Sequence, residues 1–109
     1  MTYDEVLAGR VRERLEKADL AAAEKKVFGS ILFLERGNTV AGVSGDELLV
    51  RVNPADIDAV LAQPGTRLYE LRGRTSKGWV LVAGEVLDDE VLDEWLREAW
   101  EVAAELPPK

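Results

Sequence analysis

The sequence of 109 residues contains no cysteine and no histidine. The lack of cysteine excludes disulfides and thiol nucleophiles, and the lack of histidine excludes a Ser-His-Asp triad and the common zinc sites. The chain also lacks a run of about 18 apolar residues, so we expect no membrane partner. Its first five residues, MTYDE, lack the apolar core of a signal peptide, which favours a cytoplasmic location. We expect neither a cofactor nor a metal ion.

The negative charge of the chain is concentrated in its last quarter. Lysine and arginine number 14, against 21 aspartates and glutamates, so the formal net charge is −7. Residues 85–109 contain nine of these acids and only two of the bases, and therefore account for the whole net charge. A nonspecific nucleic-acid coat needs an excess of basic residues, so we expect no direct DNA binding from this domain alone.

The apolar pattern predicts one α+β domain over residues 1–109, with elements in the order α-β-β-β-α-β-β-α. Thr2 and Glu5 fit a capping box at the start of the first helix. The apolar stripe of this helix, at helical spacing, consists of Tyr3, Leu7, Val11, Leu15 and Ala18. Short turns between the strands favour antiparallel pairing, so we expect a five-stranded antiparallel sheet flanked by helices. The predicted helices cover residues 3–18, 54–62 and 88–106, and the predicted strands cover 27–35, 39–44, 47–52, 67–72 and 79–83.

Five short motifs are spread along the whole chain. They are KKVFGS at 25–30, GNT at 37–39, LLVRV at 48–52, GRTSKGWV at 73–80 and LPPK at 106–109. In this order they resemble the signature segments of the TfoX N-terminal domain family. The resemblance implies an α+β fold similar to the secretion-chaperone-like folds. It also implies a role similar to that of bacterial regulators of natural competence, in which a second domain follows; we expect no such second domain here.

Three signature positions that usually hold methionine in this family hold Val27, Thr39 and Ser76 in this chain. One interpretation is divergence within the family. The other is that the smaller side chains, introduced by drift or by engineering, open a pocket, because a trimmed side chain leaves space behind.

A loop between Arg72 and Trp79, flanked by glycines, is the first candidate site. Arg74 and Lys77 lie in it, and such loops form small anion-binding concavities from backbone N–H groups and cations. Trp79 would stack on a ring of the ligand, and Lys26 would join if its strand is a neighbour. The predicted ligand-binding residues are Lys26, Arg72, Arg74, Lys77 and Trp79. The alternative is a solvated hairpin with Trp79 in the core.

Glu70 is the weak catalytic candidate. If its side chain points inward, burial would raise its pKa and make it a possible base. If it points outward, it is a cross-strand ion-pair partner of Arg51 or Arg72. We favour the outward orientation, because Glu70 and Arg72 share one face of the predicted strand.

The last predicted helix carries acids on one side, at Glu94, Glu98, Glu101 and Glu105. They form either a solvated face or a docking surface for a basic protein partner.

For the function of the whole domain, we favour a non-enzymatic regulatory or protein-interaction module. The alternative is a binder of anionic or aromatic small molecules, or an engineered catalyst, on the same scaffold. The sheet edges and the tryptophans of the last helix are compatible with a homodimer.

Overall fold

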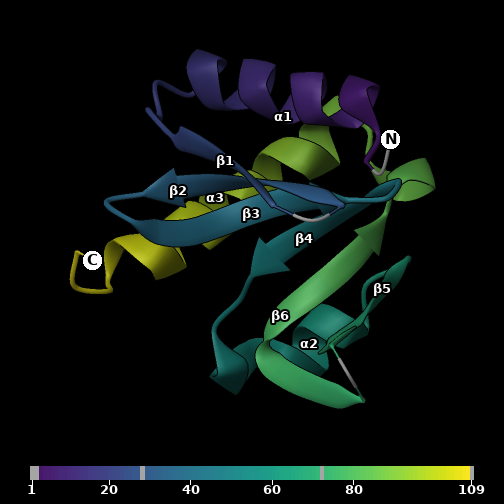
Figure 1. Cartoon of the computed structure of the whole chain (residues 1–109). Coiled ribbons are helices and arrows are strands. Elements are labelled where there is room, and N and C mark those ends of the chain that lie inside the picture. The colour runs from purple at the N-terminus through teal and green to yellow at the C-terminus, as the bar shows by residue number, and fades with distance from the viewer. Residues whose placement is uncertain (1–2, 28, 72, 109) are drawn as a thin grey trace.

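A computed structural model describes residues 3–27, 29–71 and 73–108 of the chain. In these residues, three α-helices and one antiparallel sheet form an α+β fold (Figure 1). The helices are α1 (Glu5–Lys17), α2 (Ile57–Leu61) and α3 (Asp89–Ala104), with short 3-10 helices η1 (Pro54–Asp56) and η2 (Gly84–Val86). The strands are β1 (Ala23–Val27), β2 (Ser30–Glu35), β3 (Asn38–Ser44), β4 (Glu47–Arg51), β5 (Thr66–Leu71) and β6 (Arg74–Ala83). Across the sheet they follow the order β1-β2-β3-β4-β6-β5.

The prediction of five strands is wrong, because the described residues form six. The predicted strand over residues 27–35 corresponds to β2, and the additional strand is β1, which precedes it and pairs with it in antiparallel orientation. Gly29 has a φ of 72° between the two strands. β1 lies at the edge of the sheet, and all five of its residues are exposed. An edge strand of this kind needs no alternation of apolar and polar residues, so the sequence pattern gave no signal for it.

The predicted glycine-flanked loop is also wrong. From Arg74 onward its residues belong to β6, which is ten residues long and pairs with both β4 and β5. The register of β5 against β6 shifts between Leu68 and Glu70, which marks a β-bulge. The first half of this strand consists of glycine and polar residues, so it shows no alternation of apolar and polar residues that would predict a strand. Its backbone forms a strand because it pairs with two neighbouring strands.

The N-cap of the first helix is Asp4 rather than the predicted Thr2, and the helix begins at Glu5 rather than at residue 3. The carboxylate of Asp4 accepts hydrogen bonds from the N–H groups of Val6 and Leu7 at 2.9 and 3.2 Å. Thr2 lies outside the described residues. The predicted apolar stripe of this helix is confirmed at Leu7, Val11 and Leu15, which are all buried.

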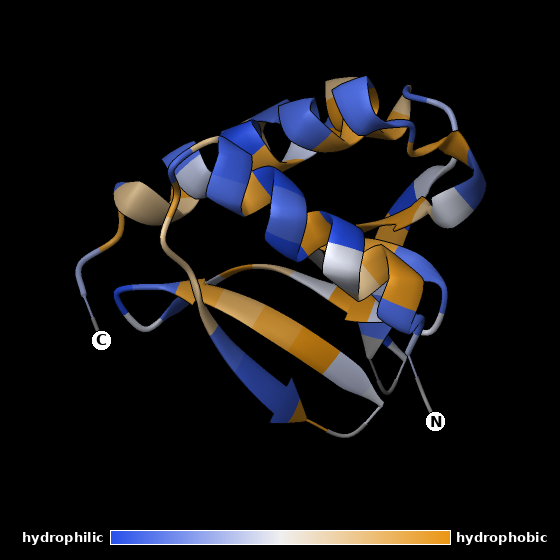
Figure 2. Cartoon of the chain, turned by 90° about the horizontal axis from the view of Figure 1, so that it is seen from above, coloured by the Kyte–Doolittle hydropathy of each residue, from blue (hydrophilic) through white to orange (hydrophobic). Residues whose placement is uncertain are grey.

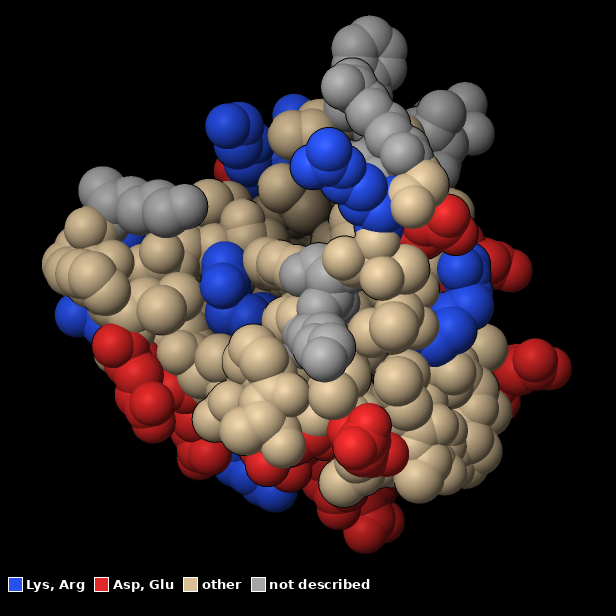
Figure 3. All heavy atoms as spheres, turned by 90° about the horizontal axis from the view of Figure 1, so that it is seen from below, with Lys and Arg blue, Asp and Glu red and all other residues tan. Residues whose placement is uncertain are grey.

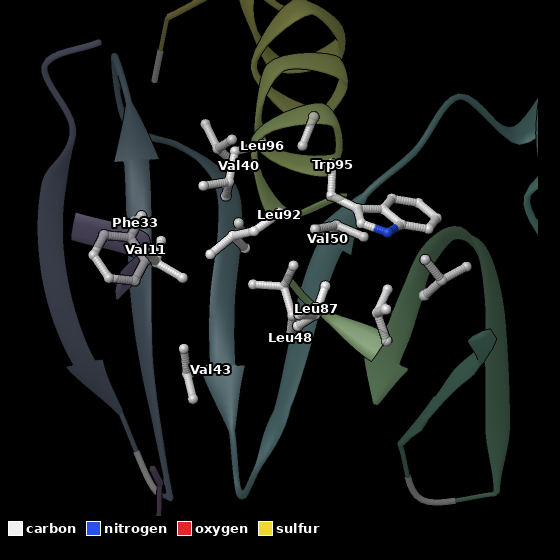
Figure 4. Packing of buried hydrophobic residues seen from close by; sticks show 14 of the residues in the cluster. Val11, Phe33, Val40, Val43, Leu48, Val50, Leu87, Leu92, Trp95 and Leu96 are labelled. Atoms are coloured by element: carbon white, nitrogen blue, oxygen red, sulfur yellow. The ribbon is translucent and has the colours of Figure 1, made fainter. Parts of the chain in front are cut away.

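All three α-helices pack on one side of the sheet, which we call the inner face (Figure 1). Their hydrophilic residues run along the sides turned away from the sheet (Figure 2). Leu92 and Leu96 of α3 project toward the middle strands of the sheet (Figure 4). The inner face of these strands carries a row of buried cross-strand partners, Ile31, Val43, Leu48 and Val82.

The opposite, outer face of the sheet carries none of the three α-helices. Leu49 and Leu81 are register partners on this face and are only 8% and 6% exposed. Gly42 lies beside them, and a Cβ on Gly42 would come within 2.8 Å of both the carbonyl oxygen of Ile31 and Cδ2 of Leu32. Seen from below, residues other than Lys, Arg, Asp and Glu make up much of the surface, with basic side chains among them, and acidic side chains gather along the rim (Figure 3).

The end of α3 is held by the turn between β2 and β3. Arg36 and Gly37 both have positive φ in this turn, at 49° and 84°. Nη2 of Arg36 donates to the carbonyl oxygen of Ala104 at 2.7 Å, and Nδ2 of the buried Asn38 donates to that of Pro107 at 2.9 Å. The first bond satisfies a carbonyl at the end of the helix that has no partner within it, and the second holds the segment that follows the helix. No helix in the described ranges is long and apolar enough to cross a membrane.

Candidate functional site

The structure does not gather the predicted ligand-binding residues into one place. Lys26 is exposed on β1 at one edge of the sheet, whereas Arg74 and Trp79 lie on β6, with three strands in between. At about 4.8 Å per strand, β1 and β6 are roughly 19 Å apart. Arg72 and the side chain of Lys77 lie outside the described part of the chain. Anion binding by these residues therefore stays a prediction.

Trp79 is neither in the core nor open on both sides of its ring. It lies on the outer face opposite Arg51 of β4, whose Cζ is 4.4 Å from the centroid of the Trp79 ring. Nε of Arg51 donates to the carbonyl oxygen of Thr39 at 2.7 Å. Burial lowers the pKa of the Arg51 guanidinium from its ordinary value, because it disfavours the charged form. Arg51 thus ties β3, β4 and β6 together at this end of the sheet.

Glu70 is exposed on β5, opposite Thr75 of β6. The expected outward orientation is confirmed. Of the two expected ion-pair partners, Arg51 contacts Trp79 and Thr39 instead, and Arg72 lies outside the described residues. The surroundings of Glu70 therefore lack the burial that would make it a base.

Val27 and Thr39, two of the three altered signature positions, lie near opposite ends of β2. Val27 pairs with Ser30 and Thr39 with Leu34, so the two pairs are four residue steps apart along β2, or roughly 13 Å at the usual rise of a strand. The side chain of Ser76 lies outside the described part of the chain. At this distance Val27 and Thr39 do not line one pocket. Divergence within the family is therefore the simpler interpretation of the three substitutions.

The carboxylates on the α1 side of α3 are held by arginines. Arg14 of α1 donates from Nε and Nη2 to the two carboxylate oxygens of Asp93, at 2.7 Å each. Arg10 donates to Asp89 at 3.1 Å and to the carbonyl oxygen of Leu87 at 2.6 Å. The hydrogen bond from Arg14 holds the pKa of Asp93 below its usual range, and nearby cations add to this effect. These ion pairs fasten α1 to α3.

On its other side, α3 forms a cleft with α2 and the end of β4. We call it the acidic cleft; its volume is about 370 Å³. Its apolar wall consists of Val52, Ala59, Val60, Trp95, Ala99 and Val102, and its acidic residues are Asp56, Glu98, Glu101 and Glu105. Among the residues described, Arg51 is the one basic residue that borders the cleft, and its guanidinium lies against Trp79. In the described part of the chain, none of the four carboxylates forms an ion pair.

The sequence predicted three of the four carboxylates of the acidic cleft. The helical spacing of Glu94, Glu98, Glu101 and Glu105 predicted an acidic side of α3, and the cleft contains the last three but not Glu94. Asp56 was missed, because nothing local shows that η1 and α2 pack beside α3. In the residues described, no group of three acidic side chains is arranged to hold a metal ion.

A comparison with known families decides the classification of the chain. Residues 13–103 match the family of the TfoX N-terminal domain. The chain belongs to the TfoX N-terminal domain family. The part that matches this family includes all six strands and α2, together with Asp56, Glu98 and Glu101 of the acidic cleft, and it ends before Glu105.

Among curated proteins and solved structures, none matches the chain significantly. The expected similarity of this TfoX N-terminal domain to secretion-chaperone-like folds therefore stays a prediction.

Proposed function

We propose that this TfoX N-terminal domain is a non-enzymatic regulatory module that binds a basic segment of a partner protein in the acidic cleft. The observation that carries the proposal is the composition of that cleft: four carboxylates and one arginine around an apolar wall. Membership of the family supports a regulatory role resembling that of competence regulators.

The charges of the acidic cleft favour a cationic occupant. Glu98, Glu101 and Glu105 follow one another at spacings of three and four residues on α3, so they repel each other at neutral pH. Asp56 adds a fourth negative charge from η1. A lysine or arginine of a partner would remove this repulsion, and such complementarity speeds and orients the approach of the partner.

The apolar wall favours a segment that also carries hydrophobic side chains. Trp95 is only 4% exposed, yet it contributes to the wall together with the half-buried Val102. A volume of about 370 Å³ has room for one or two side chains of a partner. Burial of an apolar side chain supplies affinity, while the surrounding carboxylates select for positive charge.

Binding of two model peptides tests this proposal. One is a fluorescein-labelled peptide of lysine and leucine, and the other has glutamate in place of every lysine. Fluorescence anisotropy is expected to detect binding of the basic peptide alone, with an affinity that falls as salt is added. The double variant Glu98→Lys/Glu101→Lys is expected to weaken binding by at least about tenfold.

The matched control is Glu90→Lys/Glu94→Lys, which makes the same change of charge on exposed residues of α3 outside the acidic cleft. It is expected to weaken the basic peptide far less. Equal weakening by the two double variants would show that overall charge, and not the cleft, attracts the peptide. A basic peptide that does not bind the unmodified protein would overturn the proposal.

A further inference from the structure

A second cleft lies on the opposite side of α3, where the end of α1 packs against it. We call it the basic cleft; its volume is about 400 Å³. Its apolar residues are Leu15, Ala18, Leu20 and Leu96, and its charged residues are Arg14, Lys17, Asp93 and Arg97. Three cations and a single carboxylate give it the opposite charge to the acidic cleft.

Two of the cations are left for a ligand. Asp93 is already bound at both carboxylate oxygens by Arg14. Lys17 and Arg97 form no ion pair in the described part of the chain. Lys17 and Arg97 both line the cleft together with Asp93, and beyond the hydrogen bond from Arg14 their charges help to hold the pKa of Asp93 low.

The apolar part of the basic cleft is fixed by the way α1 ends. Asp19 has a φ of 62°, in the left-handed region that side chains seldom adopt, and this turns the chain back at the end of the helix. The N–H of Leu20 then donates to the carbonyl oxygen of Leu15 at 2.9 Å. Leu20 is thereby placed against the core, next to the buried Leu15 and Leu96.

We infer that the basic cleft is a binding site for a small apolar anion, a molecule with one carboxylate and a short aliphatic or aromatic body. The carboxylate lies between Lys17 and Arg97, and the body covers Leu15, Leu20 and Leu96. The volume of about 400 Å³ is within the range of small-molecule pockets. This site is separate from the proposed docking of a basic partner, because it uses the other side of α3.

A titration with octanoate, monitored by the backbone amide resonances of the ¹⁵N-labelled protein, tests the inference. The expected shifts are centred on residues 15–20 and 93–97, and uncharged octanol is expected to bind at least about tenfold more weakly. Equal binding of octanoate and octanol would overturn the inference, as would shifts centred on the outer face of the sheet.

Charge reversal at Lys17→Glu/Arg97→Glu is expected to weaken octanoate binding by at least about tenfold. Both residues are exposed, so the fold should persist, and a circular dichroism melt checks this. The charge-conserving pair Lys17→Arg/Arg97→Lys is expected to keep most of the affinity. Loss of binding in both double variants, or in neither, would contradict the assigned role of the two cations.

Two further measurements separate this inference from the alternatives. Glu98→Lys/Glu101→Lys, in the acidic cleft, is expected to leave octanoate binding unchanged, so a failure of one site is distinguishable from a failure of the other. A peptide of glutamate and leucine is expected to bind the basic cleft no more tightly than octanoate. Much tighter binding of this peptide at residues 15–20 and 93–97 would replace the small anion with an acidic protein segment.

Discussion

On the side of α3 that faces α1, the carboxylates of Asp89 and Asp93 are bound by arginines, whereas on the side that faces α2 those of Glu98 and Glu101 form no ion pair in the described part of the chain. Both sides have apolar walls, but among the described residues the carboxylates are neutralised by arginines only on the side that faces α1. The acidic residues that give the chain its net charge of −7 therefore have two roles within one helix. On one side of α3 the carboxylates bind arginines of α1, and on the other side they remain available to a partner.

Replacing Leu92 with alanine is expected to affect both sides of α3, because Leu92 holds the helix on the sheet. Leu92 is fully buried between α3 and the sheet. Its truncation leaves a cavity and should lower the free energy of unfolding by about 2–5 kcal/mol. Urea denaturation measures the loss, with Leu92→Met as the matched control. A loss below about 1 kcal/mol would mean that α3 is not held at this position.

Replacing Asp93 with asparagine is expected to break only the α1 side. The variant loses the two charged hydrogen bonds from Arg14. Because the pair is partly exposed and screened by solvent, we expect a loss of up to about 1 kcal/mol in the free energy of unfolding. Glu94→Gln, the neighbouring exposed acid, is the control. Equal stability of Asp93→Asn and the unmodified protein would show that this ion pair does not fasten α1.

The contribution of Asp93 should depend on pH in a defined direction. Its pKa is lowered in the folded protein by the hydrogen bond from Arg14, so the ionised form is favoured by folding. The stabilisation is then complete above the ordinary aspartate pKa of about 4 and is lost as the pH falls through the lower folded value. Unfolding of the unmodified protein and of Asp93→Asn should therefore differ at pH 7 and converge in acid. A difference that grows in acid would contradict this sign.

Removing a charge on the α2 side should have the opposite and smallest effect. Glu101→Gln relieves repulsion with Glu98 and Glu105, so the free energy of unfolding is expected to rise by a few tenths of a kcal/mol. Thermal melts of this variant and of Asp93→Asn give the comparison directly. A decrease in stability for Glu101→Gln would indicate that this carboxylate has a stabilising partner within the chain.

Local patterns in the sequence were sufficient for the helices and for most of the strands. The spacing of Leu7, Val11 and Leu15 predicted the buried side of α1, and the structure confirms it. The pattern failed at β1, where every residue is exposed, and at β6, where glycine and polar residues lie in a long central strand. At both strands, pairing with other strands of the sheet determines the structure, and this pairing cannot be predicted from the local sequence pattern.

The candidate sites were predictable only in part, for the same reason. Glu98 and Glu101 are close together in sequence, and helical geometry alone puts them on one side. Lys17 and Arg97 are far apart in the chain and share a cleft only because α1 packs on α3. Lys26 was expected to join Trp79 if their strands were neighbours, but three strands lie between β1 and β6.

The sequence by itself determined the family, the helical faces and the concentration of acid in the last helix, because each follows from residues close together or from motifs in a fixed order. Only the tertiary structure decided which of those acids are neutralised. Arg14 and Asp93 are 79 residues apart and meet because α1 and α3 bury their apolar sides on the same sheet. Burial of apolar surface sets the position of each helix, and that position then decides which charges meet and which remain open.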